Sequence, residues 1–393
     1  MGHHLGTKDS LVPLIDRLNK YPIGLVDTAK LREILALIFS EEEAFVASRF
    51  PLEESTLPEL VRATGLEAST LAPILEGMAD KGLVMDMPYA GTTYYLLMPG
   101  LIGFFEFTFM KRRADLPLER LAVLMRDYLH ESQGAEFFGS RTQLTRALAY
   151  EEHIPVTSEV ATYEQARALI REAGAGAVGL CYCRHKKEHQ GKACAKGAPM
   201  EGICISLGSA AKFLSRRGFA ELKTEDELLA VLDRARDLRL THVTDNIREK
   251  PSFICNCCRC CCELMAGVQL GFQEGIAKTG FTAVIESETC DACGTCFPAC
   301  NVKAIGLPRE MIHVPKAERR AAVRQAVCLG CGACISACPK GALRLVAAPN
   351  RSLPPAKKRD LFVRILKEKG RLGPFVASRL KKQLRRALTL GRD

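Results

Sequence analysis

The chain lacks a long hydrophobic run. Its longest apolar stretch covers residues 94–110, and Pro99, Gly100, Gly103 and Glu106 interrupt it. A membrane-spanning helix needs about 20 consecutive apolar residues, so we expect no transmembrane helix and interpret this stretch as a strand followed by buried packing. The N-terminal segment also lacks the apolar centre of a secretory signal. We therefore expect a cytoplasmic protein in a reducing compartment.

The sequence also lacks the usual motifs of enzymes that use a nucleophile, a phosphate loop or a nicotinamide cofactor. Gly174, Gly176 and Gly179 match the spacing G-x-G-x-x-G. However, a helix is predicted before them (163–173) and a strand after them (177–180), the reverse of the order in a dinucleotide-binding unit. These absences argue only mildly against an enzyme, because metal-cluster chemistry does not need such residues.

Outside the C-terminal tail, the chain has no excess of positive charge. The formal net charge is +10, but residues 351–393 alone hold 14 Lys or Arg against three acidic residues. A helical pattern in this tail places five apolar residues on one face, among basic residues: Phe375, Val376, Leu380, Leu384 and Leu388. We expect a basic amphipathic helix that packs back on the protein, lies on a membrane surface, or binds an acidic protein. Nucleic acid is the least favoured partner.

Cysteine, in contrast, is abundant. The chain has 393 residues, of which 47% are hydrophobic and 25% charged, so we expect two to three folded domains. A chain of this length can bury a core without disulfides. Its 18 cysteines are therefore interpreted as metal-bound thiolates in a reducing compartment rather than as a disulfide framework.

Eight cysteines form a doubled motif. The spacing C-x2-C-x2-C-x3-C occurs twice, first in residues 290–300 and again in residues 328–338, where Pro339 follows. Residues 281–346 thus resemble a two-cluster bacterial 4Fe-4S ferredoxin. The one departure is Asn301, which stands where a proline is usual. Because that proline shapes a turn and binds no iron, the departure affects the expected geometry more than the expected ligands.

This resemblance implies crossed ligation of two [4Fe-4S] clusters, in which the fourth ligand of each cluster comes from the other repeat. One cluster would take Cys290, Cys293, Cys296 and Cys338. The other would take Cys328, Cys331, Cys334 and Cys300.

Ten further cysteines lie in two segments of the middle region. The expected metal ligands among them are Cys181, Cys183, Cys194, Cys204, Cys255, Cys257, Cys258, Cys260 and Cys261. Their spacing fits no common zinc pattern. The basic residues around 184–196 would lower thiolate pKa values and offset cluster charge. We therefore favour a third iron–sulfur cluster over zinc or metal-free thiol redox chemistry, and we expect His185 and His189 to be solvated neighbours. Adjacent side chains diverge, so six cysteines within residues 255–262 cannot all bind one metal.

The N-terminal segment resembles a winged helix. Helices are predicted over residues 31–39, 57–64 and 67–81, followed by strands over 83–86 and 93–97. The third helix carries net charge −2, from Glu67, Glu76, Asp80 and Lys81. A helix that reads DNA needs basic or amide side chains, so DNA binding is unlikely and protein docking is favoured. A further helical pattern covers residues 116–150.

The expected fold class is α+β. It comprises a winged-helix-like domain (1–110), a cysteine-rich α/β middle domain (111–280), a ferredoxin-like domain (281–346) and a basic helical tail (347–393). The CxCR and CNCCxCCC segments ahead of a ferredoxin module resemble multidomain 4Fe-4S dicluster proteins of anaerobic bacteria. The favoured function is low-potential electron transfer between protein redox partners. The alternatives are an oxidoreductase with its active site in the middle domain and, less favoured, an iron–sulfur redox-sensing transcription regulator.

Overall fold

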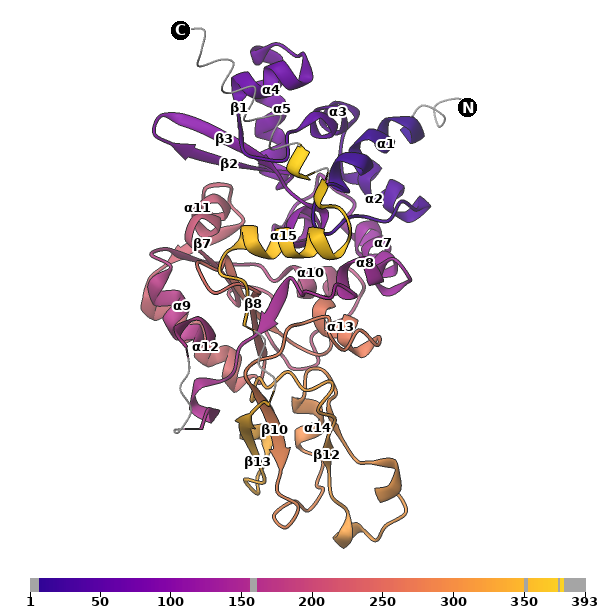
Figure 1. Cartoon of the computed structure of the whole chain (residues 1–393), viewed down its shortest axis with the longest axis vertical. Coiled ribbons are helices and arrows are strands. Elements are labelled where there is room, and N and C mark those ends of the chain that lie inside the picture. The colour runs from indigo at the N-terminus through magenta and orange to yellow at the C-terminus, as the bar shows by residue number, and fades with distance from the viewer. Residues whose placement is uncertain (1–6, 156–160, 350–352, 374, 378–393) are drawn as a thin grey trace. The chain divides into compact units, whose positions relative to one another are not determined.

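The computed structural model describes residues 7–155, 161–349, 353–373 and 375–377 (Figure 1). The chain divides into two compact units, one made of residues 1–137 and 362–393 and the other of residues 138–361. Helices and strands occur in both units, so the fold is α+β. No helix within the described residues is both long and apolar enough to cross a membrane.

The first unit is mainly helical. Its helices are α1 (Thr7–Leu18), α2 (Ala29–Ile38), α3 (Glu41–Arg49), α4 (Leu57–Thr64), α5 (Ala68–Lys81), α6 (Phe105–Phe109) and α7 (Leu118–His130), and α8 (Gly134–Phe138) ends at its boundary. A small antiparallel sheet has the order β1-β3-β2, from Ser55–Thr56 (β1), Val84–Tyr89 (β2) and Thr92–Leu97 (β3). The helices and strands predicted between residues 31 and 97 therefore form within a few residues of their expected positions.

Local sequence signals explain where these helices begin and end. Ser40 and Glu43 form a capping box at the start of α3. α5 ends at Gly82, whose φ of 76° is left-handed. A Cβ at Gly82 would meet the Phe107 Cβ at 2.6 Å, so this turn requires glycine. Apolar residues spaced as on one helix face, such as Leu31 and Leu75, are fully buried.

The prediction of a helical pattern over residues 116–150 is wrong in its second half. After α8 the chain enters strand β4 (Thr145–Ala147). The apolar helical repeat ends at Leu129, and β4 instead pairs with β8 (Thr241–Asp245) through the register Thr145↔Asp245. Long-range strand pairing therefore overrides the local pattern here.

The second unit is built on a six-stranded sheet of order β4-β8-β9-β6-β5-β7. Its remaining strands are β5 (Gly176–Gly179), β6 (Cys204–Leu207), β7 (Ala220–Lys223) and β9 (Phe253–Cys257). The helices between them are α9 (Ala166–Glu172), α10 (Tyr182–Glu188), α11 (Gly208–Arg216), α12 (Glu225–Asp237) and α13 (Glu263–Gln269). Gly174, Gly176 and Gly179 follow a helix and enter β5, as the sequence predicts.

The expected α/β class of the middle region requires correction. Each neighbouring pair of strands recorded in this sheet is antiparallel. Helices do alternate with strands along the chain. However, each strand runs in the opposite direction to its neighbours in the sheet, so the parallel sheet typical of α/β folds does not form. This antiparallel pairing brings the cysteines of β6 and β9 to neighbouring positions.

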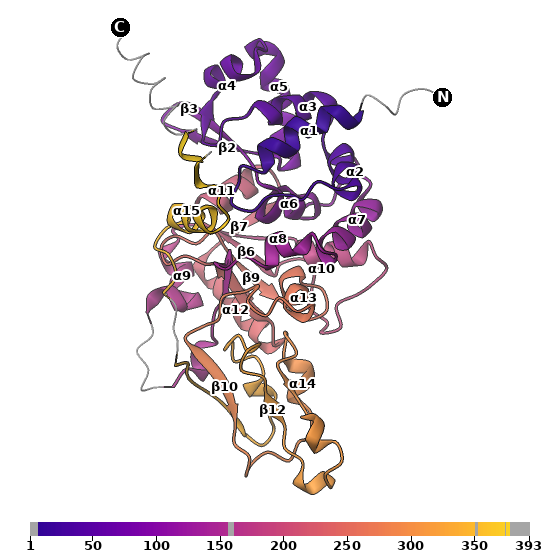
Figure 2. The same cartoon turned by 45° about the vertical axis from the view of Figure 1, so that its right-hand side comes forward.

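The ferredoxin-like segment contains two short antiparallel ribbons (Figure 2). β10 (Phe281–Ile285) pairs with β13 (Leu343–Ala347), and β11 (Ile305–Gly306) pairs with β12 (Ala322–Val323). The first cysteine repeat leads into α14 (Cys296–Ala299), and the β10–β13 ribbon joins the two ends of the segment. The pairing therefore brings the two repeats into one structural unit.

After this segment, α15 (Lys358–Glu368) continues the chain. Of the predicted tail helix, Phe375 and Val376 are described, whereas Leu380, Leu384 and Leu388 lie outside the described residues. The alternatives for the tail therefore stay predictions.

Candidate metal centres

The eight cysteines of the doubled motif line two separate cavities. The first cavity is lined by Cys290, Cys293, Cys296 and Cys338. The second is lined by Cys300, Cys328, Cys331 and Cys334. In each set, three cysteines come from one repeat and the fourth comes from the other. The structure thus brings together the same residues that the resemblance to ferredoxins groups.

The two cavities differ in exposure. Around the first cavity Cys293 is exposed, and Cys290 and Cys338 are partly buried. Around the second cavity Cys300, Cys328 and Cys334 are all buried. Burial also raises the pKa values of Cys296 and Cys331 to about 11, and for Cys331 a hydrogen bond from Thr241 opposes the effect. Bound metal would hold these thiols as thiolates.

The backbone of the second repeat is held closely against its surroundings. Gly330 has a φ of +69°, and a Cβ there would meet the carbonyl oxygen of Phe281 at 2.0 Å. The Thr279 hydroxyl donates to the Gly330 carbonyl at 3.0 Å, and the Tyr150 N–H donates to the Cys331 carbonyl at 3.0 Å. Glycine at this position lets the loop approach β10 while its cysteines turn into the cavity.

Two donors point at sulfur atoms of the second cavity. The Ala304 N–H donates to the Cys300 Sγ at 3.1 Å, and the Thr241 hydroxyl donates to the Cys331 Sγ at 3.5 Å. Hydrogen bonds to ligand sulfur raise the potential of an iron–sulfur cluster. Thr241 comes from β8, so the six-stranded sheet contributes to this cavity.

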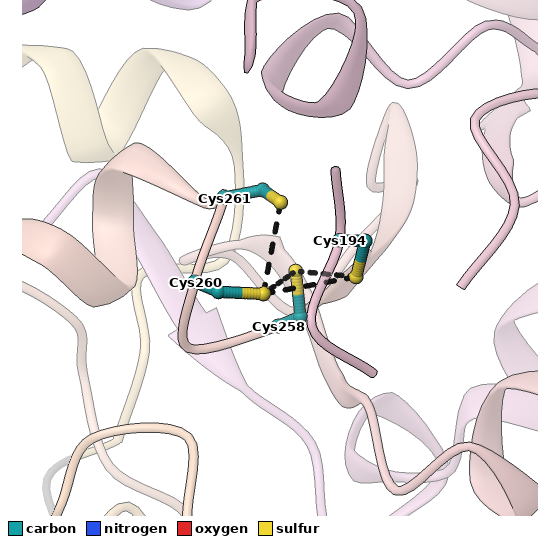
Figure 3. A group of neighbouring side chains, drawn as sticks. All are labelled: Cys194, Cys258, Cys260 and Cys261. Atoms are coloured by element: carbon teal, nitrogen blue, oxygen red, sulfur yellow. Dashed lines mark hydrogen bonds between the residues drawn. The ribbon is translucent and has the colours of Figure 1, made fainter. Parts of the chain in front are cut away.

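In the middle region, Cys194, Cys258, Cys260 and Cys261 form a cluster that we call the tetrad (Figure 3). Their four sulfur atoms all lie within 4.8 Å of one another. Cys194 contacts Cys258 and Cys260 at 3.7 Å each, Cys260 contacts Cys258 at 3.6 Å, and Cys260 contacts Cys261 at 3.7 Å. Three of these cysteines come from the loop between β9 and α13, and Cys194 comes from the loop after α10.

The other six middle cysteines form a second group, the hexad: Cys181, Cys183, Cys204, Cys255, Cys257 and Cys262. Thiol–thiol hydrogen bonds link them into a closed ring in the order 181, 183, 262, 257, 255, 204 and back to 181. All six line one cavity. Cys262 is not among the ligands expected from the sequence. Its position two residues after Cys260 carried no signal that distinguished it from its neighbours.

A buried ion pair joins α10, which carries Cys183, to α13, which Cys262 directly precedes. Lys186 on α10 pairs with Glu263 at the start of α13, and their side chains are 2% and 6% exposed. This contact holds the start of α10, with Cys183, beside Cys262.

The basic residues near the first middle segment are more deeply placed than the sequence suggests. Arg184, His185 and Lys186 are all buried, so the expectation that His185 is a solvated neighbour is wrong. The His185 Nε2 lies 3.2 Å from the His189 Nε2. The short helix α10 begins directly after Cys181 of the hexad, and three consecutive basic side chains on it are buried.

Asn301, the departure from the ferredoxin pattern, connects the second cavity to the tetrad loop. Its side-chain amide donates to the Arg239 carbonyl and to the Thr241 hydroxyl, both at 2.9 Å. Its Oδ1 accepts from the backbone N–H of Arg259 at 3.2 Å, and Arg259 lies between Cys258 and Cys260. Proline could make none of these side-chain contacts. The asparagine therefore ties the ferredoxin-like segment to the cysteine-rich loop.

Lys196 lies between the same two regions. Its ammonium donates to the Arg239 carbonyl at 2.6 Å and to the Ala299 carbonyl at 3.2 Å. Burial lowers its pKa, whereas the charges of Cys331, Cys258, Cys260 and Cys300 oppose that effect. A cation thus stands between the second ferredoxin-like cavity and the tetrad.

Comparison with known proteins supports the ferredoxin-like segment. Residues 289–342 match the family model described as a 4Fe-4S dicluster domain. Neither the curated proteins nor the solved structures that were compared contain a match to the chain. The segment is therefore a 4Fe-4S ferredoxin-type module, and the cysteine-rich middle region supports an iron–sulfur protein.

Proposed function

We propose that this chain is an electron-transfer protein that passes low-potential electrons between protein redox partners. Cys290, Cys293, Cys296 and Cys338 would hold one [4Fe-4S] cluster, and Cys300, Cys328, Cys331 and Cys334 would hold the second. The observation that carries this proposal is the crossed grouping, in which each cavity is lined by three cysteines of one repeat and one of the other. When bound, such clusters supply reversible one-electron transfer.

The difference in burial supports a direction for the path. The first cavity has an exposed cysteine, Cys293, where a partner can approach. The second cavity has three buried cysteines and one partly buried cysteine, and it is joined through Asn301 to the tetrad loop. We therefore place the exchange with an external protein at the first cavity, and the internal end of the path at the second.

The tetrad would hold a further metal centre. A single tetrahedral ion with metal–sulfur bonds of about 2.3 Å places its sulfur ligands about 3.8 Å apart. The 3.6–3.7 Å contacts of the tetrad fit that arrangement. A cubane binds each cysteine to a different iron and needs wider spacing. We therefore propose a mononuclear zinc or iron ion at the tetrad, rather than the iron–sulfur cluster favoured from the sequence.

The N-terminal unit would serve as a docking domain of winged-helix type. Its helices α2, α4 and α5 and the β2–β3 ribbon support this proposal. Glu67, Glu76 and Asp80 on α5 are exposed, which disfavours DNA and therefore the transcription-regulator alternative. We accordingly propose a protein partner for this unit. The organisation as a multidomain dicluster protein of anaerobic bacteria is part of the same proposal.

An oxidoreductase active site in the middle region is the second candidate. The observation that favours it is the cysteine-lined cavity beside the buried Arg184, which neither repeat of the ferredoxin motif contributes to. A substrate would then be converted there with electrons supplied by the ferredoxin-type module. This candidate requires turnover, whereas the first requires only electron exchange between partners.

The first test is metal analysis and redox titration of the full chain purified without oxygen. Electron transfer predicts at least about eight irons per chain with matching acid-labile sulfide, and reversible reduction at low potential. Zinc in place of iron, or iron that cannot be reduced and reoxidised, would contradict the proposal. The control is a Cys293→Ser variant, in which the exposed first cluster should be impaired while the enclosed second cluster remains.

A further inference from the structure

The hexad is assembled by strand geometry. Successive side chains of a strand point to opposite faces, so Cys255 and Cys257 on β9 share one face. β6 runs beside β9 with the register Ile205↔Ile254, which places Cys204 next to Cys255. Cys181 follows β5, the other neighbour of β6. Three neighbouring strands thus deliver thiols to the same end of the sheet.

Consecutive cysteines separate the hexad from the tetrad. Cys257 belongs to the hexad ring and Cys258 to the tetrad, and the same division occurs between Cys262 and Cys261. Adjacent side chains diverge along the backbone, so each pair sends one thiol to each group. The ten middle cysteines therefore form two sites that share a wall.

The six thiols of the hexad are too many for one tetrahedral ion, which takes four. Cys258 and Cys261 of the tetrad also line this cavity, where the two groups meet. The space between its lining atoms, counted with its opening to solvent, is about 370 Å³. The same quantity is about 310 Å³ and 360 Å³ for the two ferredoxin-like cavities. Since those two have the ligand grouping of cubane sites, the hexad cavity has room for a cluster of similar size. Among the residues that the structure describes, the cysteines share this lining with Tyr182, Arg184, Asn256 and Leu264.

Arg184 supplies an independent indication of negative charge in this cavity. It is 4% exposed, and its Nη2 donates to the Asn256 carbonyl at 3.1 Å. Its Nε and Nη1 are buried and have no hydrogen-bond partner in the described part of the chain. The charges of Cys181 and Cys204 in the hexad and of Cys258 in the tetrad act on the guanidinium, which also has a hydrogen bond with Cys194 of the tetrad. A buried cation with unpaired donors is unfavourable unless an anionic group lies beside it.

We propose that the hexad is a separate polynuclear iron–sulfur site, held by Cys181, Cys183, Cys204, Cys255, Cys257 and Cys262. Arg184 neutralises part of its charge on the side that faces the tetrad. This site goes beyond the electron-transfer proposal and does not depend on it, because its ligands include none of the ferredoxin-type cysteines.

The first experiment counts iron, acid-labile sulfide and zinc per full-length chain purified without oxygen. The ferredoxin-type module accounts for about eight irons. We expect about four or more irons beyond these, with matching sulfide, and we expect ⁵⁷Fe Mössbauer spectra to show a component additional to the cubanes. Iron that stops at about eight, or several zinc ions in place of the excess iron, would overturn the proposal. This count does not depend on any variant folding.

The second experiment uses the consecutive pair as matched variants. Cys262→Ser should remove the excess iron and sulfide and leave the tetrad ion in place. Cys261→Ser should remove about one metal ion and leave the excess iron and its Mössbauer component. If both variants lose the same metal and the same spectral component, the two groups are one site and the proposal is wrong. Cys257→Ser and Cys258→Ser repeat the comparison on the other pair.

These outcomes are distinguishable from failure of the electron-transfer proposal. A chain with about eight reducible irons and no excess supports electron transfer and overturns the hexad site. In the opposite case, the ferredoxin-type clusters cannot be reduced but the Cys261→Ser variant keeps the excess iron. That result overturns the electron-transfer proposal and supports the hexad site.

Discussion

In the ferredoxin-type module, the four cysteines around each cavity come from two loops of fixed spacing, whereas the middle cysteines come from strand ends, helix starts and a long loop. Around the first cavity, Cys296 interacts with Cys290, Cys293 and Cys338 through their charges. In the middle region the sulfur atoms contact one another directly, at 3.6–3.7 Å in the tetrad. Loop spacing thus specifies open cubane sites, while the sheet specifies the more crowded thiol groups.

The two regions also differ in how they handle charge. The second ferredoxin-type cavity offers neutral donors to sulfur, from the Ala304 N–H and the Thr241 hydroxyl. The middle region places the buried guanidinium of Arg184 between its two thiol groups. Burial alone would lower the pKa of Arg184, but the charges of Cys181, Cys258 and Cys204 raise it. The arginine therefore stays charged, as a partner for closely packed thiolates must.

The largest expected effect tests crossed ligation in the ferredoxin-type module. Cys300→Ala and Cys328→Ala should each remove about four irons, and the double variant should lose no more than either single variant, because both cysteines serve one cluster. Combining Cys300→Ala with Cys290→Ala should remove about eight. Iron analysis and Mössbauer spectroscopy measure these losses.

The opposite result would contradict crossed ligation, and with it the difference proposed between the two regions. If Cys300→Ala and Cys290→Ala together removed no more iron than one alone, each repeat would hold its own cluster. All four ligands of each cluster would then come from one repeat, and the two repeats would not exchange ligands.

The next largest effect tests the charge of Arg184. Arg184→Met should leave the packed thiolates without their buried cation and lower the free energy of unfolding by about 3 kcal/mol or more. Arg184→Lys keeps the charge and should recover a large part of this loss. Chemical denaturation without oxygen, followed by cluster absorbance, measures both variants. Equal losses in the two would show that the arginine acts through its shape alone.

A smaller effect is expected where the two regions meet. Asn301→Pro restores the residue usual in ferredoxins but removes the contacts to Arg239, Thr241 and Arg259. Buried hydrogen bonds contribute about 1 kcal/mol each, so the loss should be about 2–3 kcal/mol. The iron content of the module should stay unchanged, because Asn301 ligates nothing in the proposed sets.

Hydrogen exchange should localise the effect of Asn301→Pro to the tetrad loop. Asn301→Ala is the matched control, since it removes the same contacts without fixing the backbone. A proline variant that loses the second cluster, while the alanine variant keeps it, would show that backbone shape at this position matters more than the contacts.

Much of the ferredoxin-type module was predictable because its ligands lie at fixed spacing on loops. The partition of the ten middle cysteines was not. Cys181 and Cys204 become neighbours of Cys255 only when β5, β6 and β9 pair. Similarly, nothing in the local sequence shows that His185 turns inward, since the packing of α10 decides it. The spacing of cysteines along one loop predicts which of them share a site, whereas the grouping of cysteines from different strands depends on how those strands pair.

The smallest effect belongs to the first unit, whose residues 1–137 contain no cysteine and so provide a metal-free reference. Glu136 accepts hydrogen bonds from the Gly24 N–H at 2.9 Å and from Lys369 and Arg371 at 2.8 Å each. Burial would raise the pKa of Glu136, but these donors outweigh it and lower the pKa. A lowered carboxyl pKa stabilises the fold above the unfolded value, and that contribution is lost as pH falls through the folded value.

Glu136→Gln should therefore lower the stability of this unit by about 1 kcal/mol at neutral pH and by less at acidic pH, without changing the iron content. Thermal denaturation at several pH values, together with metal analysis, measures both quantities. Iron lost from the Glu136→Gln variant would mean that the cysteine-free unit supports the metal sites directly. Unchanged iron with reduced stability would confine metal-dependent folding to residues 138–361, where all the cysteines lie.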